Sequence, residues 1–180
     1  MRSRSPRARG PADARRGTRL ADNDADIVTL HRYFVWAGEM KQSFEVTAAS
    51  RPQPLEWASE ETIRALMYMC LWYGVLRAVV EGWEELKLAD PTIDSLLATR
   101  TGTMMKVRDK DDAEYDVPET YSDMLRRVRN AVFHFQRDYL DDRLIAFMQK
   151  KESVVWVRSL HEAFSQWFLS WLKSRRSRGG

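Results

Sequence analysis

One short segment of the chain combines a cation, an amide and an imidazole. Arg129 is followed directly by Asn130, and His134 follows after four intervening residues. A histidine near its unperturbed pKa of about 6.5 gives or takes a proton at neutral pH. An arginine binds a phosphate in bidentate fashion through its planar guanidinium. Together these residue types suit acid–base chemistry on a phosphate ester.

The segment belongs to a helix that we expect from about Glu119 to Phe135. On a helical wheel centred on Val128, the core face spans about 60° to either side; it comprises Tyr121, Met124, Leu125, Ala131, Val132 and Phe135. Arg129 and His134 fall on the two flanks, roughly 140° apart. We expect a basic, phosphate-binding patch on this helix, made of Arg126, Arg127, Arg129 and Arg137.

Phe133 falls on the outward side of the same helix, where an aromatic ring lacks a partner within the chain. A two-fold dimer that packs this helix against its copy would bury the ring. Such a dimer would also bring Arg129 of one protomer toward His134 of the other. We therefore expect a homodimer with Phe133 in its interface.

Arg129, Asn130 and His134 resemble the RxxxxH motif of the HEPN superfamily, whose commonest form has Asn directly after Arg. The aromatic, Met-rich helix that ends in Val79-Val80-Glu81-Gly82-Trp83 is similar to the corresponding helix of that family. The resemblance implies a HEPN-like, metal-independent endoribonuclease without a cofactor. It would cleave RNA at a composite dimer site, as a toxin or phage-defence component. Arg129 and His134 would be catalytic, and Asn130 would support them.

A second interpretation remains open beside the enzyme. A non-catalytic helical interaction protein, such as an antitoxin-like or regulatory partner, would keep the fold without the chemistry. For the chain in either role, an antitoxin or another protein is a candidate partner. In that case the arginines form an ordinary solvated helix face, and His134 caps a neighbouring carbonyl. Acidic charge in the centre of the chain favours this interpretation, whereas the cluster of Arg129, Asn130 and His134 favours the enzyme.

Hydrophobic periodicity predicts an all-α fold, an up-and-down bundle of about five to six helices. Besides the helix around Arg129, helices are expected at about 24–47, 59–86, 91–99, 141–150 and 153–173. Ser59 is the expected cap of the second helix, and Asp90-Pro91 marks the start of the third. Residues 100–118 are polar and are expected to form a long loop, with a short hairpin at most around Met104–Val107.

The chain has 180 residues and a formal charge of +3, which is unevenly distributed. Seven arginines lie in residues 1–20, and four more basic residues lie in 173–178; without these segments 18 basic and 25 acidic residues remain, a formal charge of −7. We expect a disordered Arg-rich tail at 1–21, a helical domain at 22–173 and a disordered basic tail at 174–180. Nucleic acid would then contact the tails or the local basic patch.

The single cysteine bears on the cellular compartment, and the length of the apolar runs bears on membrane association. Cys70 is the single cysteine, which favours a reducing, cytoplasmic setting. The longest uncharged apolar run, Ala65 to Leu76, has twelve residues, whereas a membrane span needs about 20. We therefore expect a buried core helix there and no membrane association.

Several other features are expected to be structural. His31 and His161 lie near apolar stripes and fit satisfied core histidines. The tryptophans of the last helix fit a core stripe better than a base-stacking platform. Arg77 and Glu81 are spaced for an ion pair, although Glu81 has the alternative of facing the site. The acidic residues 109–116 lack the spacing of a calcium loop, and no metal site is expected.

Overall fold

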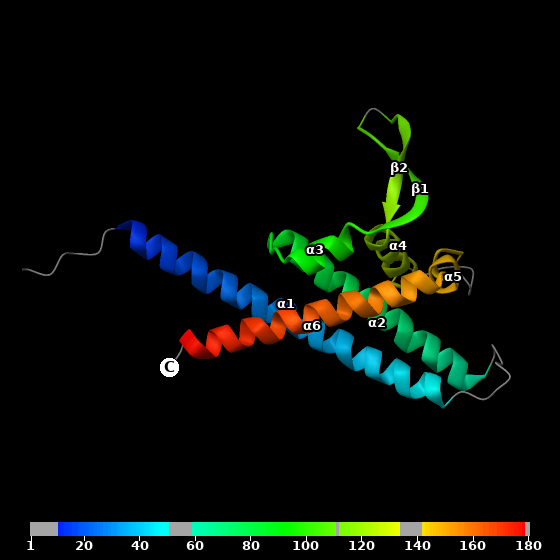
Figure 1. The fold of residues 1–180 in the computed structure, drawn as a ribbon, viewed down its shortest axis with the longest axis horizontal. Coiled ribbons are helices and arrows are strands. Elements are labelled where there is room, and N and C mark those ends of the chain that lie inside the picture. The colour runs from blue at the N-terminus through cyan, green and yellow to red at the C-terminus, as the bar shows by residue number, and fades with distance from the viewer. Residues whose placement is uncertain (1–10, 51–58, 111, 134–141, 179–180) are drawn as a thin grey trace, which may run out of the picture.

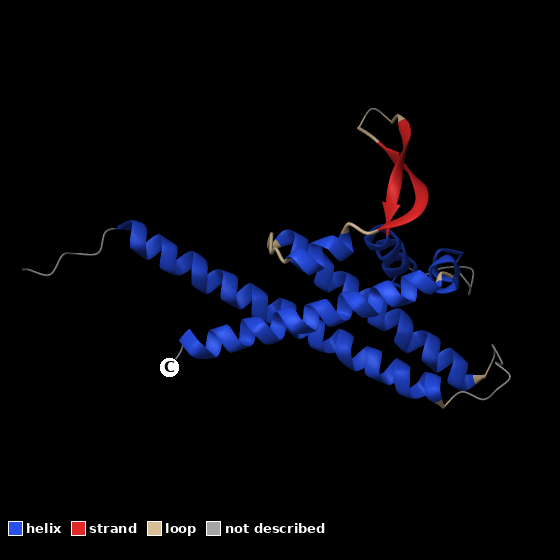
Figure 2. Ribbon diagram, viewed as in Figure 1, coloured by secondary structure: helices blue, strands red, loops and turns tan. Residues whose placement is uncertain are grey.

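The computed structural model describes residues 11–50, 59–110, 112–133 and 142–178, and this part of the chain is mostly helical (Figure 1). Long helices α1 (Pro11–Ala49), α2 (Glu60–Glu85) and α6 (Lys151–Arg178) form the framework. Three shorter helices flank them: α3 (Pro91–Leu97), α4 (Tyr121–Phe133) and α5 (Asp142–Gln149). The strands β1 (Arg100–Arg108) and β2 (Glu114–Thr120) form one antiparallel hairpin that projects from the helices (Figure 2).

The expected helix starts are confirmed where a cap can be identified. The Ser59 side chain accepts a hydrogen bond from the Thr62 backbone N–H at 3.2 Å. This satisfies one of the backbone N–H groups at the start of α2 that have no partner within the helix. Asp90 caps α3 in the same way, accepting from Thr92 N and Ile93 N, with Pro91 at the first helical position. These local interactions are encoded in adjacent residues, so the sequence pattern identifies them.

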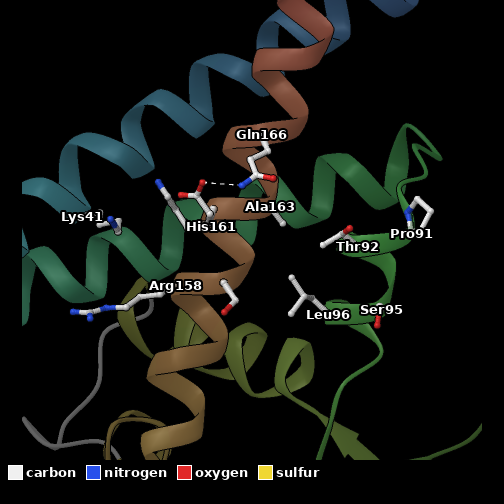
Figure 3. Close-up of a pocket in the computed structure, with 11 residues that line it drawn as sticks. Lys41, Pro91, Thr92, Ser95, Leu96, Arg158, His161, Ala163 and Gln166 are labelled. Carbon is white, nitrogen blue, oxygen red and sulfur yellow. Dashed lines mark hydrogen bonds between the residues drawn. The ribbon is translucent and has the colours of Figure 1, made fainter.

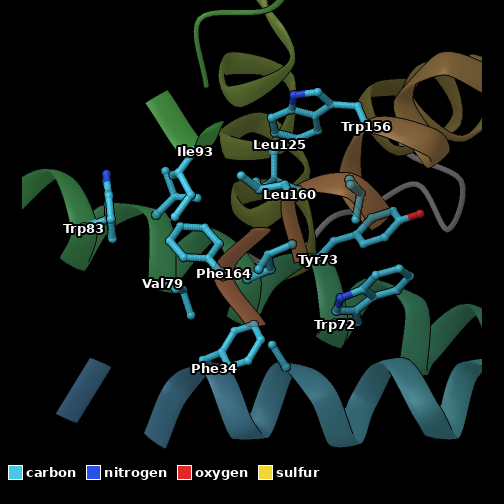
Figure 4. Packing of buried hydrophobic residues seen from close by; sticks show 14 of the residues in the cluster. Phe34, Trp72, Tyr73, Val79, Trp83, Ile93, Leu125, Trp156, Leu160 and Phe164 are labelled. Carbon is cyan, nitrogen blue, oxygen red and sulfur yellow. The ribbon is translucent and has the colours of Figure 1, made fainter. Parts of the chain in front are cut away.

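The core lies mainly where α1, α2, α4 and α6 pack together, and aromatic rings dominate it (Figure 4). Phe34 of α1 stacks on Phe168 of α6 at 5.0 Å between ring centroids, and Trp83 of α2 meets Phe164 at 5.4 Å. The expected apolar stripe of the last helix is confirmed as core, because Val157, Leu160, Phe164 and Phe168 are buried.

Both predicted tails differ from the structure. α1 begins at Pro11, whereas the sequence predicts disorder up to residue 21 and a helix only from about Asp24. α6 continues to Arg178, beyond the expected end at residue 173. An apolar stripe marks the part of a helix that packs, and a helix can extend beyond it.

The predicted loop at 100–118 is wrong, because most of it is the β1–β2 hairpin. Met105 pairs with Val117 and Lys106 with Asp116, and Gly102 adopts a φ of 80° where the register shifts. One face of the hairpin is exposed, whereas the other carries the half-buried Met105, Val107 and Val117. Apolar and polar residues alternate over 105–108 and over 114–117, so each strand carries a short alternation typical of a half-buried strand. The polar residues 109–113 and the flanking residues favoured the loop interpretation instead.

α2 is long and apolar enough to cross a membrane by length and composition alone, and half of its most apolar stretch is buried in the protein. Trp72, Leu76, Val79 and Val80 are fully buried among the other helices. The expectation that this apolar run lies in a core helix is met, since Ala65, Met69, Trp72, Tyr73 and Leu76 of the run are buried.

Candidate functional site

Arg129 lies on α4 and reaches toward the neighbouring helix α2. Its Nη1 donates a hydrogen bond to Asn130 Oδ1 at 2.9 Å, and its Nη2 donates to Glu81 Oε2 at 3.4 Å. The side chains of Arg129 and Glu81 are both 37% exposed. The structure therefore joins two residues predicted from the motif, and it adds a carboxylate from a helix 48 residues away along the chain.

Glu81 is itself held by the buried Arg77 on the same helix. Arg77 Nε lies 3.4 Å from Glu81 Oε1, its Nη1 donates to Ser122 Oγ at 3.1 Å, and its Nη2 donates to Glu84 Oε2 at 3.2 Å. The predicted Arg77–Glu81 ion pair is confirmed. Glu81 also faces Arg129, so one carboxylate contacts arginines of two helices. Arg77 thus fixes Glu81, and Glu81 restrains the Arg129 guanidinium.

Arg129 stands at the rim of a cavity of about 500 Å³ between α1, α2 and α4. Its lining contains three carboxylates and the aromatic ring of Tyr33; the lining residues are Asp26, Thr29, Leu30, Tyr33, Ala78, Glu81, Gly82, Glu85, Leu86 and Arg129. Three acidic groups against one guanidinium disfavour a phosphate deep in this cavity. Within the part of the chain that the structure describes, no group of three or more His, Cys, Asp or Glu side chains is placed to hold a metal ion.

The basic patch predicted on α4 is neutralised by carboxylates where the structure describes it. Arg126 Nη2 lies 3.2 Å from Asp123 Oδ1, and Arg127 pairs with the buried Glu119. Thr103 Oγ1 also donates to Glu119 at 2.7 Å, so Arg127 helps to anchor the hairpin to α4. The predicted partners Arg137 and His134 lie outside the described residues. Arg126, Arg127 and Arg129 therefore do not form a free cluster of positive charge.

Phe133 is 53% exposed, in agreement with its predicted outward position. The structure adds a contact that the helical wheel does not reveal. The far edge of the ring lies against the backbone of α2 at Gly74, where a β-carbon would collide with it. Phe133 therefore has a partner within the chain for one edge, while about half of its surface remains available to another molecule.

His161 lies on α6 and satisfies the expectation of a buried, hydrogen-bonded histidine. Trp72 Nε1 donates to its Nδ1 at 3.3 Å, and its ring lies 4.8 Å from that of Phe34. Burial and the nearby Lys41 ammonium lower the pKa of His161 to about 4, against the smaller opposing effects of Glu162 and Glu45. The imidazole is therefore neutral at pH 7.

The sequence did not reveal that His161 also borders the larger cavity between α1, α3 and α6, of about 870 Å³ (Figure 3). Lys41 and Arg158 lie on the same side of α6 as His161, whereas Thr92, Ser95 and Leu96 of α3 lie on the other side. Charges of both signs line it, because Glu162 is present and accepts a hydrogen bond from Gln166 at 3.1 Å. This cavity lacks a polar pattern that selects one ligand.

His31 and Cys70 show no chemistry of their own. His31 packs on Phe168 at 5.0 Å between ring centroids, and burial lowers its pKa. Burial raises the pKa of the Cys70 thiol to about 11, so the thiolate is scarce at neutral pH. Cys70 fits the structural role that its apolar surroundings predict. His31 packs on the core but is half-buried, and within the described residues its side chain forms no hydrogen bond, so the expectation of a satisfied core histidine is met only in its packing.

Comparison of the chain with protein-family models, with curated proteins and with solved structures found no match.

Proposed function

We propose that this chain is a HEPN-like, metal-independent endoribonuclease of the cytoplasm that acts as a toxin or phage-defence component. The supporting observation is the arrangement around Arg129, whose guanidinium is oriented by the amide of Asn130 and the carboxylate of Glu81. Preorganised cationic groups are those that stabilise charge developing on a phosphate. His134 follows α4 directly in the sequence and supplies the titratable group that this chemistry needs.

The reaction requires a base, an acid and positive charge. One His134 imidazole accepts the proton of the ribose 2′-hydroxyl, whose oxygen attacks the adjacent phosphorus. The bond from phosphorus to the 5′-oxygen breaks, and that oxygen takes a proton from a second, protonated imidazole. Arg129 stabilises the negative charge on the phosphate oxygens. The products are a 2′,3′-cyclic phosphate and a 5′-hydroxyl, and two protomers supply the two imidazoles.

A non-catalytic helical interaction protein is the second candidate, and the ion pairs on α4 favour it. Arg126, Arg127 and Arg129 each face a carboxylate, so an RNA phosphate must compete with Asp123, Glu119 or Glu81 for them. The enzyme requires Arg129 to exchange Glu81 for the phosphate, at least in part. An interaction protein needs no such exchange, and its binding would not depend on His134.

The deciding experiment measures cleavage of single-stranded RNA by the full chain. We expect His134→Ala to reduce the rate by about 10²–10⁴-fold, and Arg129→Ala to have a comparable effect. Arg129→Lys should restore only part of the rate, because the planar fork is lost. EDTA should leave the rate unchanged, and the products should end in a 2′,3′-cyclic phosphate.

Arg64→Ala is the matched control, because Arg64 forms an exposed ion pair with Glu60 near the start of α2. It should leave the rate unchanged. Equal cleavage by the wild type and by His134→Ala would rule out the proposed site. If the wild type cleaves no RNA, induction in growing cells separates the two candidates: toxicity that requires Arg129 and His134 supports the nuclease, and toxicity independent of them supports binding.

A further inference from the structure

Arg32, Tyr33 and Trp36 of α1 lie within one helical turn and form an aromatic and cationic surface, which we call the α1 platform. The rings of Tyr33 and Trp36 meet edge to face at 5.3 Å between centroids. The Arg32 guanidinium carbon lies 5.3 Å from the Trp36 ring centre and 5.5 Å from that of Tyr33. Trp36 is 48% exposed, so an indole with a cation beside it faces solvent.

Arg32 differs from the described arginines of α4 in its charge balance. Within the described residues it forms no ion pair or hydrogen bond, and its guanidinium lies beside the rings of Tyr33 and Trp36. Arg126, Arg127 and Arg129 each have a carboxylate partner. Arg32 therefore keeps its charge available for a phosphate without first giving up an internal partner.

Tyr33 connects the platform to the candidate site. Its side chain lines the cavity at whose rim Arg129 stands, together with Thr29 and Leu30 from the same helix. On the helical wheel Trp36 falls between Arg32 and Tyr33, on the side of α1 turned away from the core residues Phe34 and Ala37. The platform thus begins at the Arg129 cavity and continues outward along α1.

We propose that the α1 platform is a nucleotide subsite for single-stranded RNA, in which an unpaired base stacks on Trp36 and Tyr33 while Arg32 binds its phosphate. This inference rests on the proposed function for its substrate class. Aromatic rings accept any base by stacking, and an adjacent arginine adds both stacking and charge. The carboxylates Asp26, Glu81 and Glu85 keep phosphates out of the cavity itself, so the base faces it and the backbone stays on the Arg32 side.

The test measures binding without cleavage, so that it does not depend on catalysis. A fluorescently labelled 2′-O-methyl RNA oligonucleotide lacks the nucleophilic hydroxyl, and its anisotropy reports binding to the full chain. Loss of one stacked base in Trp36→Ala should weaken affinity about tenfold, and Trp36→Phe should retain most of it. Arg32→Ala should reduce the slope of log affinity against log salt by about 0.7, the value for one phosphate contact on a single strand. Arg32→Lys should keep that slope.

Tyr115→Ala is the matched control, because Tyr115 is also 48% exposed but lies on the projecting hairpin. Affinity unchanged in Trp36→Ala, an equal loss in Tyr115→Ala, or no binding by the wild type would overturn the subsite. A wild-type dimer that becomes monomeric in Trp36→Ala would also overturn it, since a second copy would then cover the platform.

If binding depends on Trp36 but the unmodified RNA stays intact, the subsite stands and the nuclease proposal fails. If RNA is cleaved but neither binding nor cleavage depends on Trp36, the nuclease proposal stands and the subsite fails.

Discussion

At the scale of single residues, His161 shows how burial sets a protonation state. Its pKa falls to about 4 in the folded protein, whereas the unfolded chain titrates near the ordinary value of 6.5. Between these values the unfolded state binds more protons, so stability should fall as the pH drops from about 6.5 toward 4. We expect this histidine to contribute about 2 kcal/mol to that loss.

The measurement is the free energy of unfolding at pH 7 and at pH 4.5, compared between the wild type and His161→Gln. Glutamine keeps an acceptor for the Trp72 indole N–H, so the variant removes the titration with little change in packing. The difference in the free energy of unfolding between the wild type and His161→Gln should narrow or change sign at pH 4.5. An NMR titration that places the His161 pKa near 6.5 would contradict the prediction.

At the scale of elements, the contact between α2 and α4 depends on one missing β-carbon. Gly74→Ala should place a methyl group against the Phe133 ring and destabilise the protein by about 1–2 kcal/mol. Gly38→Ala is the matched control, because a β-carbon there meets nothing within 4 Å. It should stabilise the protein by about 0.5–1 kcal/mol, the usual gain of alanine over glycine in a helix.

Phe133→Ala decides whether the ring causes the effect of Gly74→Ala. With Phe133 replaced, the three atoms nearest to the added methyl group are gone, so the Gly74→Ala cost should fall and the double-mutant cycle should show a coupling energy. Denaturant unfolding of the four proteins gives the coupling energy. Additive effects of the two substitutions would show that another contact limits this position.

At the scale of the whole molecule, assembly determines whether a composite site exists. Ile63, Met67 and Gly74 share one face of α2 by their spacing, and the Phe133 ring lies against Gly74. Ile63, Met67 and Phe133 are all exposed, so an apolar strip runs along α2 and α4. We expect a second copy to cover this strip and to place His134 of one protomer near Arg129 of the other.

Light scattering of the purified chain should then give about 42 kDa, twice the 21.1 kDa of one chain. Phe133→Asp and Met67→Asp should halve that mass, because each places a charge in the apolar contact. Val155→Asp is the control, since Val155 is an exposed apolar residue on α6. A monomer at micromolar concentration would remove the two-imidazole mechanism.

Local and periodic features of this protein were readable from the sequence alone. The caps Ser59 and Asp90, the apolar stripe of α6 and the Arg77–Glu81 pair each involve residues within a few positions of one another, and the structure bears them out. The motif also placed Arg129 and Asn130 on one helix correctly. Such features depend on helix geometry, which is the same in every protein.

Only the tertiary structure decided which distant groups meet. The Glu81 carboxylate beside Arg129, the Gly74 contact of Phe133 and the Tyr33 ring in the same cavity all join different helices, and helical periodicity carries no information on those pairings. The sequence predicts a short hairpin at most around Met104–Val107, and the structure extends it to Arg100–Thr120. Its alternation of apolar and polar residues covers only four residues on each strand, so its full length was not predicted. The charge state of the α4 patch was likewise decided by Asp123, Glu119 and Glu81, which packing and local turns bring to its arginines.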